Sequence, residues 1–394
     1  MFKVISYGKQ SINQTDIDAV VRILKGDWLT QGPAVNTFEN DLQNYFGAKF
    51  ACAVSNGTAA LHLSGLALGW QPNDIIITIP ITFLATANCI VYAGATPDFV
   101  DIDPKTYTID PNLVEEKVRA YKLNGKTIKA IIGVDYAGHP CDWKALREIA
   151  DKYEIQLVND NCHALGAKYY DDIQYAVKYA DLVIQSYHPV KHLTTGEGGA
   201  VLTNNSELDE KVRCLRTHGI TKDNSKFSIQ NSTLNEPWYY EMHEVGYNYR
   251  ITDFQCALGS SQLKKLDSFI QKRCKIAKQY DDSFANIENL KTPKVQSKAE
   301  HSYHLYPLQI NFEKIPLTKV HFFEKMKNAG INLQVHYIPV HLQPFYQKKF
   351  GFRKGDYPIS ERFYQNELSL PIYPNLSDKD VSLVIDNVLE ATST

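Results

Sequence analysis

The chain has 394 residues, and its hydrophobic and charged fractions, 44% and 22%, are those of an ordinary globular protein. Because this length exceeds the roughly 250–300 residues at which a single core stops growing, we expect one large domain with a smaller companion. The formal net charge of −2 provides no field to hold nucleic acid or an anionic membrane, so a phosphate-bearing ligand would need a local site.

The N-terminal stretch, MFKVISYGKQSINQTD, has no apolar run of signal-peptide length, and no later segment approaches ~20 uninterrupted apolar residues. The seven cysteines are scattered and never form a CxxC pair. We therefore expect reduced thiols in a cytoplasmic protein that has no membrane span and no metal site.

The first predicted helix spans residues 15–28. It begins with the TDID capping signature, and its apolar residues share one face: Ile17, Val20, Val21, Leu24 and Trp28.

From about residue 50, short apolar runs alternate with helical stretches that start near Thr58 and Thr86. The runs are FACAVS, IIITIP, TPDFVDI, AIIGVDY, IQLVND, DLVIQSYH and GAVLT. Each is short enough for a strand and apolar enough to be covered on both faces. This alternation predicts an α/β fold with a mostly parallel central sheet.

The pattern changes after Thr252. Residues 253–286 contain no proline and space their apolar residues helically, which predicts one long connecting helix. The rest of the chain mixes strands (YPLQINF, INLQVHYIPV) with helices (LTKVHFFEKMKNAG, ISERFYQNELS). We therefore predict a large domain at 1–252 and a small C-terminal α+β domain at 253–394.

The stretch SNGTAA follows a predicted strand and opens a helix. The unpaired N–H groups and partial positive charge of a helix N-terminus suit an anion, Gly57 lets that anion approach the backbone, and Thr58 adds a hydroxyl. With Ala59, these residues form a candidate phosphate site. Alone, the stretch fits an ordinary capped helix start better.

Asp160 ends the apolar run in LVNDNCHALGA, at the carboxyl end of a strand, where ligands collect in open α/β sheets. Its carboxylate could pair with a protonated ring nitrogen. Asp160 could equally be a turn cap, and His163 could simply satisfy a nearby backbone group.

Lys191 lies in SYHPVKHLTTGEGG, a loop after a buried strand. A loop lysine is usually a solvated surface charge, but the glycines of TTGEGG suit a chain that lies close to a ligand or crosses a crowded cleft. A phosphate site, a carboxylate and a lysine, each at the end of a strand, make up the set that binds pyridoxal phosphate. The amine condenses with its aldehyde, and the carboxylate keeps its ring nitrogen protonated.

The motifs SNGTAALHL, PITFLATAN, VNDNCHALGA, SYHPVKHLTTGEGGA and GYNYRITDFQCALG resemble, in this order, those of the DegT/StrS sugar aminotransferases, which are pyridoxal-phosphate enzymes of fold type I. The resemblance covers nearly the whole chain and implies that Lys191 is the Schiff-base lysine and that Asp160 is the partner of the pyridine nitrogen. Two details differ: Asn159 replaces a frequent glutamate, and Asn161-Cys162 replaces a small pair.

The same resemblance implies the remaining cofactor contacts. Gly57, Thr58 and Ser186 would hold the phosphate, Phe83 would stack on the ring, and His163 would lie near the phenolic oxygen. Asn248, in GYNYR, would reach the phosphate of a neighbouring subunit, which implies a homodimer with shared active sites.

Other stretches, among them YGKQSI, DWLTQGP and GINLQVHYIPVHLQPFY, are similar to the members of this family that act in pseudaminic acid biosynthesis. The resemblance implies ping-pong transfer of an amino group from L-glutamate to C4 of a UDP-linked 4-keto-6-deoxy-N-acetylhexosamine. Tyr7, Thr30, His336 and Tyr337 are candidate sugar contacts by resemblance, although core packing explains the aromatic residues equally well.

Three alternatives stay open. The chain could aminate C4 of another UDP- or dTDP-linked 4-keto sugar. It could be a sugar dehydratase on the same fold, although such enzymes carry histidine in place of the lysine. It could also be a noncatalytic binding protein, which would be expected to lose Asp160 or Lys191.

Overall fold

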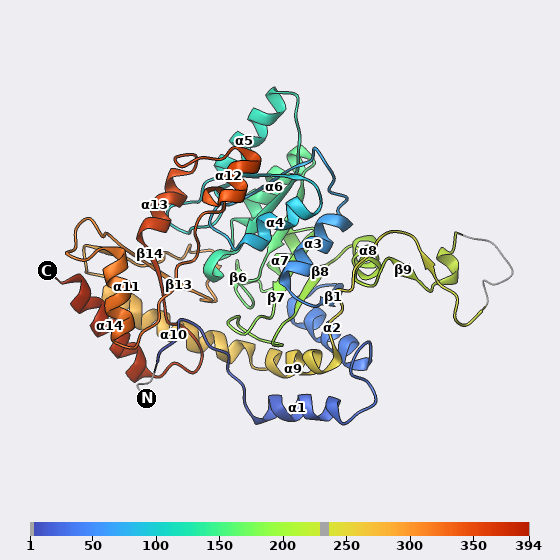
Figure 1. Ribbon diagram of the computed structural model, residues 1–394, viewed down its shortest axis with the longest axis horizontal. Coiled ribbons are helices and arrows are strands. Elements are labelled where there is room, and N and C mark those ends of the chain that lie inside the picture. Colours follow the sequence, from blue (N-terminus) through green and yellow to red (C-terminus); the bar gives the residue numbers. More distant parts are fainter. Residues whose placement is uncertain (1–3, 229–235, 394) are drawn as a thin grey trace.

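The computed structural model describes residues 4–228 and 236–393, and a seven-stranded sheet lies at its centre (Figure 1). In spatial order the strands are β1 (Phe50–Val54), β8 (Gly199–Thr203), β7 (Leu182–Ser186), β5 (Gln156–Asp160), β4 (Ile128–Val134), β2 (Ile75–Thr78) and β3 (Thr96–Phe99). β8 runs antiparallel to both neighbours, and the other pairings are parallel. The predicted α/β fold with a mostly parallel sheet is confirmed.

Both faces of this sheet are buried. Alternate strand residues face opposite cores: Ile77 and Ile131 belong to one, and Ile76 and Ile132 to the other. The covering helices are α2 (Pro33–Phe46), α3 (Gly57–Ala67), α4 (Leu84–Tyr92), α5 (Pro111–Leu123), α6 (Trp143–Tyr153), α7 (Tyr175–Tyr179) and α8 (Ser206–Arg216). Two-sided burial explains why the strands read as continuous apolar runs.

A buried carboxylate joins helices α2 and α8 to strand β1. Glu39 accepts hydrogen bonds from the Ala53 N–H at 2.9 Å, Arg213 at 2.7 Å and Arg216 at 2.8 Å. Its 3% exposure leaves these groups as its partners in place of water.

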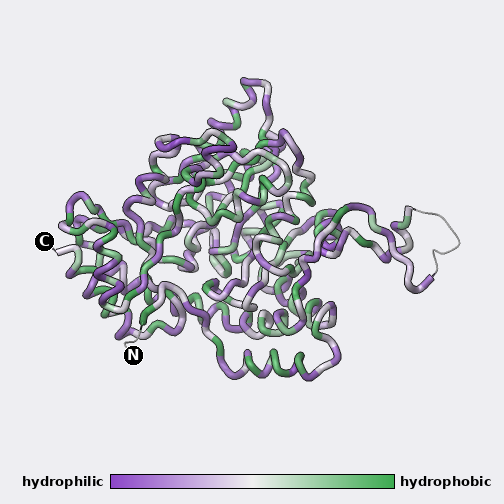
Figure 2. Tube along the Cα trace, in the orientation of Figure 1, coloured by the Kyte–Doolittle hydropathy of each residue, from purple (hydrophilic) through white to green (hydrophobic). Residues whose placement is uncertain are grey.

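Helix α1 (Gln14–Leu24) differs from the prediction at both ends. Its N-cap is Asn13, which forms a capping box with Asp16, and it ends before Trp28. Its apolar face is largely open, because Ile17, Leu24 and Trp28 are exposed, whereas Asp16 is buried. In Figure 2, α1 alternates hydrophobic and hydrophilic residues along the lower edge of the molecule.

The predicted single helix at 253–286 is wrong: the chain forms α9 (Asp253–Leu263) and α10 (Leu266–Phe284). Ser261, Gln262 and Lys265 all donate hydrogen bonds to the buried carboxylate of Asp16. This tie between α9 and α1 is a tertiary interaction, so the local periodicity gave no sign of the break.

The C-terminal part packs around a third core. The elements of this core are the antiparallel strands β11 (Leu290–Lys291), β13 (Tyr306–Ile310) and β14 (Glu367–Leu370), with helices α11 (Lys319–Asn328) and α14 (Asp378–Thr392). Helices α12 (Pro344–Phe350) and α13 (Pro358–Asn366) pack against the large part instead, since Tyr346 lies in a cluster with Phe99 and Phe363 joins a core of the central sheet. Helix α10 contacts both parts, since Leu266 packs in the large core and Phe284 in the C-terminal core. Ile5 also belongs to the C-terminal core, so the N-terminal segment crosses to this part of the molecule.

Two strand boundaries differ from the prediction here. The stretch INLQVHYIPV is extended but forms only the isolated bridges of Ile331 and Gln334, because the side chain of Glu367 takes the His336 N–H. The end of ISERFYQNELS is not helical and starts β14.

Two short strand pairs complete the fold: β6 (Lys168–Tyr169) with β12 (Ala299–Glu300), and β9 (Ile220–Thr221) with β10 (Glu241–Met242). β9 lies on an arm that projects from the body (Figure 1). Within the described residues, no helix combines the length and the apolar character needed to cross a bilayer.

Candidate active site

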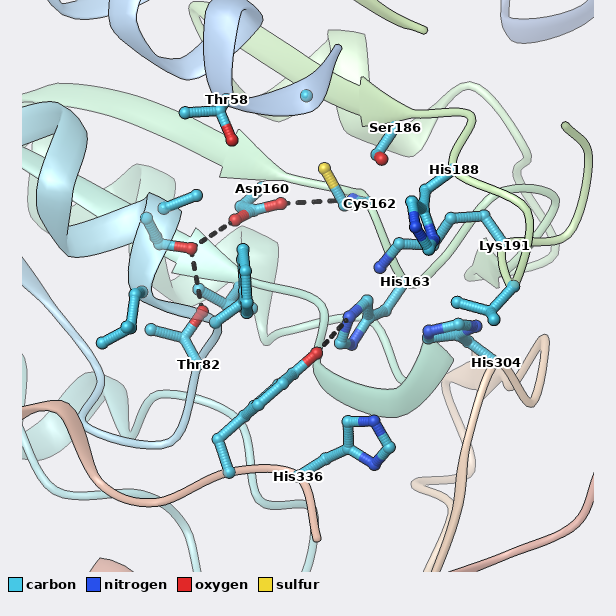
Figure 3. Close-up of a pocket in the computed structure, with 18 of the residues that line it drawn as sticks. Thr58, Thr82, Asp160, Cys162, His163, Ser186, His188, Lys191, His304 and His336 are labelled. Carbon is cyan, nitrogen blue, oxygen red and sulfur yellow. Dashed lines mark hydrogen bonds between the residues drawn. The ribbon is translucent and has the colours of Figure 1, made fainter. Parts of the chain in front are cut away.

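A cavity of about 720 Å³ opens where β5 and β7 end. Residues from the central sheet and its loops form one wall, and Tyr7 with the segment 334–338 forms the opposite wall. Ten of the predicted site residues line it: Tyr7, Gly57, Thr58, Phe83, Asp160, His163, Ser186, Lys191, His336 and Tyr337. Figure 3 shows how the labelled side chains converge on this space.

The N-terminus of α3 borders the cavity. Asn56 caps this helix, since its side chain accepts a hydrogen bond from the Ala59 N–H at 2.8 Å. A Cβ at Gly57 would lie 2.9 Å from the Cβ of Ser186, which explains why glycine stands there. The hydroxyls of Thr58 and Ser186 therefore border the cavity beside the positive end of a helix.

Gly199, which ends the TTGEGG stretch and starts β8, lies against the same helix start. A Cβ there would come within 2.6 Å of the Asn56 carbonyl carbon. Glycine therefore allows two chain segments to approach closely at this position. This agrees with the expectation that the glycines of TTGEGG let the chain cross a crowded region.

Asp160 ends β5 and is 5% exposed. The hydroxyl of Thr86 donates to its Oδ2 at 2.7 Å, and the backbone N–H of Cys162 donates to its Oδ1 at 3.3 Å. Thr82 lies 2.8 Å from the Thr86 hydroxyl and extends this chain of hydrogen bonds. The carboxylate is therefore held in a fixed orientation at the edge of the cavity.

Lys191 lies on the loop after β7, where its N–H donates to the His188 carbonyl at 2.9 Å. In Figure 3 its side chain extends into the space between Asp160 and His163. Burial lowers the pKa of the Lys191 amine, although Cys162 and Asp160 act in the opposite direction. A larger fraction of this amine is thus unprotonated at neutral pH than of an ordinary lysine.

His163 is buried and hydrogen-bonded at both ring nitrogens. The Ala137 N–H donates to Nδ1 at 3.3 Å, so Nε2 carries the proton and donates to the Tyr337 hydroxyl at 3.1 Å. Burial and the nearby charge of Lys191 lower the pKa of His163 well below its usual range. The ring is therefore a neutral wall of the cavity.

Phe83 precedes α4 and is 57% exposed although it borders the cavity. Its ring lies 6.0 Å from that of Tyr337. An aromatic ring left uncovered beside buried polar groups suits stacking on a planar ligand.

Three predicted residues lie away from the cavity lining. The N–H of Ala59 is taken by the Asn56 cap. Thr30 is exposed and forms a bridge with Thr252, and Asn248 is exposed and forms a bridge with Thr217. Thr30 and Asn248 therefore do not line this cavity, and a role for either residue would need a contact that this subunit does not supply.

The cavity lining also holds residues that the sequence-based reasoning missed, among them Asn56, Thr82, Thr86 and His304. The sequence held one signal, because Thr82 and Thr86 are two hydroxyl residues four apart in a mostly apolar stretch, although Thr82 lies before the start of α4. His304 comes from the C-terminal part, 4.4 Å from the His163 ring, and no local pattern connects the two.

The residues present fit pyridoxal phosphate. An amine of lowered pKa suits an aldehyde, a fixed carboxylate suits a ring nitrogen, and a helix N-terminus with two hydroxyls suits a phosphate. The glycine at 57 leaves room beside Ser186 that a Cβ would fill.

Comparisons with known proteins agree with this arrangement. Residues 10–389 match the DegT/DnrJ/EryC1/StrS aminotransferase family. The chain is 41% identical over 386 residues to a UDP-4-amino-4,6-dideoxy-N-acetyl-beta-L-altrosamine transaminase of Campylobacter jejuni, covering 98% of this chain and 96% of that protein.

Two solved structures are similar over almost their whole length. Helicobacter pylori PseC, an aminotransferase involved in the biosynthesis of pseudoaminic acid, has a TM-score of 0.88 at 32% identity, with 99% of each chain covered. The PLP form of Spr1654 from Streptococcus pneumoniae has a TM-score of 0.87 at 29% identity, with 99% of this chain and 100% of that one covered.

Proposed function

The chain belongs to the DegT/DnrJ/EryC1/StrS aminotransferase family, and we propose that it transfers the amino group of L-glutamate to C4 of a UDP-linked 4-keto-6-deoxy-N-acetylhexosamine. Membership of the family makes it a pyridoxal-phosphate-dependent sugar aminotransferase. The product we propose is UDP-4-amino-4,6-dideoxy-N-acetyl-β-L-altrosamine, in pseudaminic acid biosynthesis. The Campylobacter and Helicobacter relatives support this choice by their names.

One observation carries the proposal: Lys191 and Asp160 border the same cavity beside the N-terminus of α3. Lys191 would hold the cofactor aldehyde, Asp160 the ring nitrogen, and Thr58 with Ser186 the phosphate. Pyridoxal phosphate supplies an electrophilic carbon for the amino group and a ring that accepts an electron pair.

Lys191 also has the properties of the base that moves the proton. Its pKa is lowered by burial, so its amine can accept a proton near neutral pH and return it at the neighbouring carbon. Asp160 stays oriented by Thr86 during both half-reactions. Phe83 lies open beside the cavity, and His163 is a buried neutral ring. We expect these two side chains to keep water from the faces of the bound cofactor ring.

The opposite wall is the proposed sugar site. Tyr7 and the segment 334–338 face the sheet-side residues across the cavity. We assign His336 and Tyr337 to sugar contact, in keeping with their position in this lining. Thr30 stays a prediction only, because it lies outside the lining.

A homodimer is part of the proposal. Asn248 is exposed and does not line the cavity of its own subunit, which is compatible with a contact to the phosphate in a second copy. The apolar side chains of Ile17, Leu24 and Trp28 are uncovered on α1 and could be buried by such a copy. A cytoplasmic location is likewise still a prediction.

The test is a spectrum of the purified protein followed through each half-reaction. We expect a yellow protein whose colour is lost with L-glutamate and returns with a UDP-linked 4-keto sugar. A panel of UDP- and dTDP-linked 4-keto sugars, with identification of the amino product, decides which nucleotide and epimer is accepted.

Two results would count against the proposal. A protein that is indifferent to glutamate would favour a binding protein or a dehydratase, and preference for a dTDP-linked sugar would favour another branch of the family. Lys191→Ala should lose the colour change, and Lys178→Ala, an exposed lysine paired with Asp172, is the matched control.

A further inference from the structure

His336, on the sugar-side wall, is hydrogen-bonded through its backbone and its ring. Its N–H donates to Glu367 Oε2 at 3.0 Å, and its carbonyl accepts from the Tyr136 hydroxyl. Its ring Nδ1 lies 2.8 Å from Ser369 Oγ, and that hydroxyl donates to Glu367 Oε1 at 2.5 Å. A chain of hydrogen bonds thus runs from the buried carboxylate to the ring.

The local fold builds this chain. Glu367 and Ser369 are two apart on β14, so their side chains point to the same face of the strand, and both are fully buried. The Ser369 N–H donates to the Gln334 carbonyl at 2.8 Å, which brings the segment containing His336 alongside β14.

The direction of the hydrogen bonds follows from counting protons. A carboxylate has no proton to give, so the single hydroxyl proton of Ser369 goes to Glu367. The Ser369 oxygen must then accept from His336 Nδ1. A neutral imidazole with its proton on Nδ1 carries a free lone pair on Nε2. This nitrogen can therefore accept a hydrogen bond.

The charge states support this assignment above neutral pH. Burial raises the pKa of Glu367 to about 7, opposed by its hydrogen bonds and by the positive charge of Lys319. Burial lowers the pKa of His336 to about 3, with a further contribution from Lys191, so the ring stays neutral. The other ionisable groups that face Glu367 are the tyrosines Tyr107, Tyr136 and Tyr337, whose raised pKa values keep them neutral.

We propose that Glu367 and Ser369 are positioning residues that hold His336 in the Nδ1–H tautomer, so that its Nε2 accepts a hydrogen bond from a hydroxyl group of the sugar. This assignment of the donor rests on the proposed function. A hydroxyl group fits this acceptor because it is uncharged, so binding it beside the buried His336 ring does not require a charge to be buried. The neighbouring ring of Tyr7, 5.3 Å away, borders the same part of the cavity.

The first test reads the tautomer directly and needs no activity. Protein labelled with ¹⁵N-histidine is measured by NMR at pH 8.5, and the His336 signals are assigned by their loss in His336→Asn. We expect a protonated Nδ1 and an unprotonated Nε2 in the unsubstituted protein. Ser369→Ala and Glu367→Gln should each raise the Nε2-protonated fraction, whereas a protonated Nε2 in the unsubstituted protein would overturn the proposal.

The matched control is Ser360→Ala. Ser360 is as fully buried as Ser369 and also donates its hydroxyl to a carboxylate, Asp101, at 2.5 Å, but that carboxylate belongs to the other end of the chain from Glu367 and His336. This variant should leave the His336 signals unchanged.

The second test separates the two half-reactions by stopped-flow absorbance. Ser369→Ala should lower kcat/KM for the sugar half-reaction about tenfold and leave the glutamate half-reaction within about twofold, and Ser369→Thr should recover most of the loss. Equal losses in Ser369→Ala and Ser360→Ala, or equal losses in both half-reactions, would contradict a role toward the sugar. If the unsubstituted protein aminates no sugar, the proposed function fails while the NMR result still decides the tautomer.

Discussion

Thr86→Val tests the support of the Asp160 carboxylate, the proposed partner of the cofactor ring, with almost no change in side-chain shape. Thr86 provides the 2.7 Å hydrogen bond to Asp160 Oδ2, while the other oxygen keeps only the longer bond from the Cys162 N–H. Valine cannot donate, so Asp160 loses its better-formed partner and its fixed orientation.

The size of the effect follows from the kind of bond. A hydrogen bond to a charged group contributes about 1.5–3 kcal/mol, which corresponds to roughly 10- to 150-fold in a dissociation constant. Because Cys162 still holds Oδ1, we expect the lower end, a Kd for pyridoxal phosphate that is about tenfold higher.

The assay is a titration of the apoprotein with pyridoxal phosphate, followed by absorbance and protein fluorescence. Thr78→Val is the matched control, since Thr78 is equally buried on β2 and donates to the Ile132 carbonyl at 3.0 Å, away from Asp160. Thr82→Val should fall between them. Equal affinities in the Thr86 and Thr78 variants would refute the idea that Thr86 orients the carboxylate.

Three further predictions concern stability and the helix start. Glu39→Ala leaves two partly buried arginines without their carboxylate and should lower the free energy of unfolding by about 3–5 kcal/mol in a urea titration. Burial raises the pKa of Asp16, but hydrogen bonds from Lys265 and Ser261 outweigh it and the net pKa is lowered. Ionised Asp16 therefore stabilises the fold above the pKa of an unfolded aspartate, and this stabilisation is lost as pH falls through the pKa of Asp16 in the folded protein. Asp16→Asn should flatten the dependence of the unfolding free energy on pH below about pH 4, and an unchanged slope there would contradict this. Gly199→Ala forces a Cβ to within 2.6 Å of the Asn56 backbone, so we expect weaker pyridoxal-phosphate binding in the same titration. Gly196→Ala is the control. This glycine has open space around it but a φ of +83°, so the substitution should strain only the loop and leave the Kd for pyridoxal phosphate unchanged.

The central sheet and its ligand-bearing edge could be predicted because their signals are local. A strand buried on both faces shows as an apolar run, and a polar residue at its carboxyl end stands out, as Asp160 does. The loop of Lys191 was found in the same way, and the structure brings both residues to one cavity.

The rest depended on contacts between distant segments. The break between α9 and α10 coincides with three hydrogen bonds to Asp16, some 245 residues earlier in the chain. The exposed face of α1 has the same periodicity as a buried one, and periodicity does not say what will cover a helix. Likewise, no local pattern connects Glu367 to His336, because their hydrogen bond joins residues 31 positions apart in the chain.

The two walls of the cavity belong to different parts of the molecule. Substitutions in the proposed sugar site can therefore be distinguished from substitutions in the proposed cofactor site. Substitutions at Tyr7, Gln334 or Val335 would change the wall proposed for the sugar and keep the Tyr337 hydroxyl that bonds to His163. A library of variants confined to these three positions should therefore yield altered acceptor preference with the proposed glutamate half-reaction intact. Acceptor preference could then change while the residues proposed to hold the cofactor are kept.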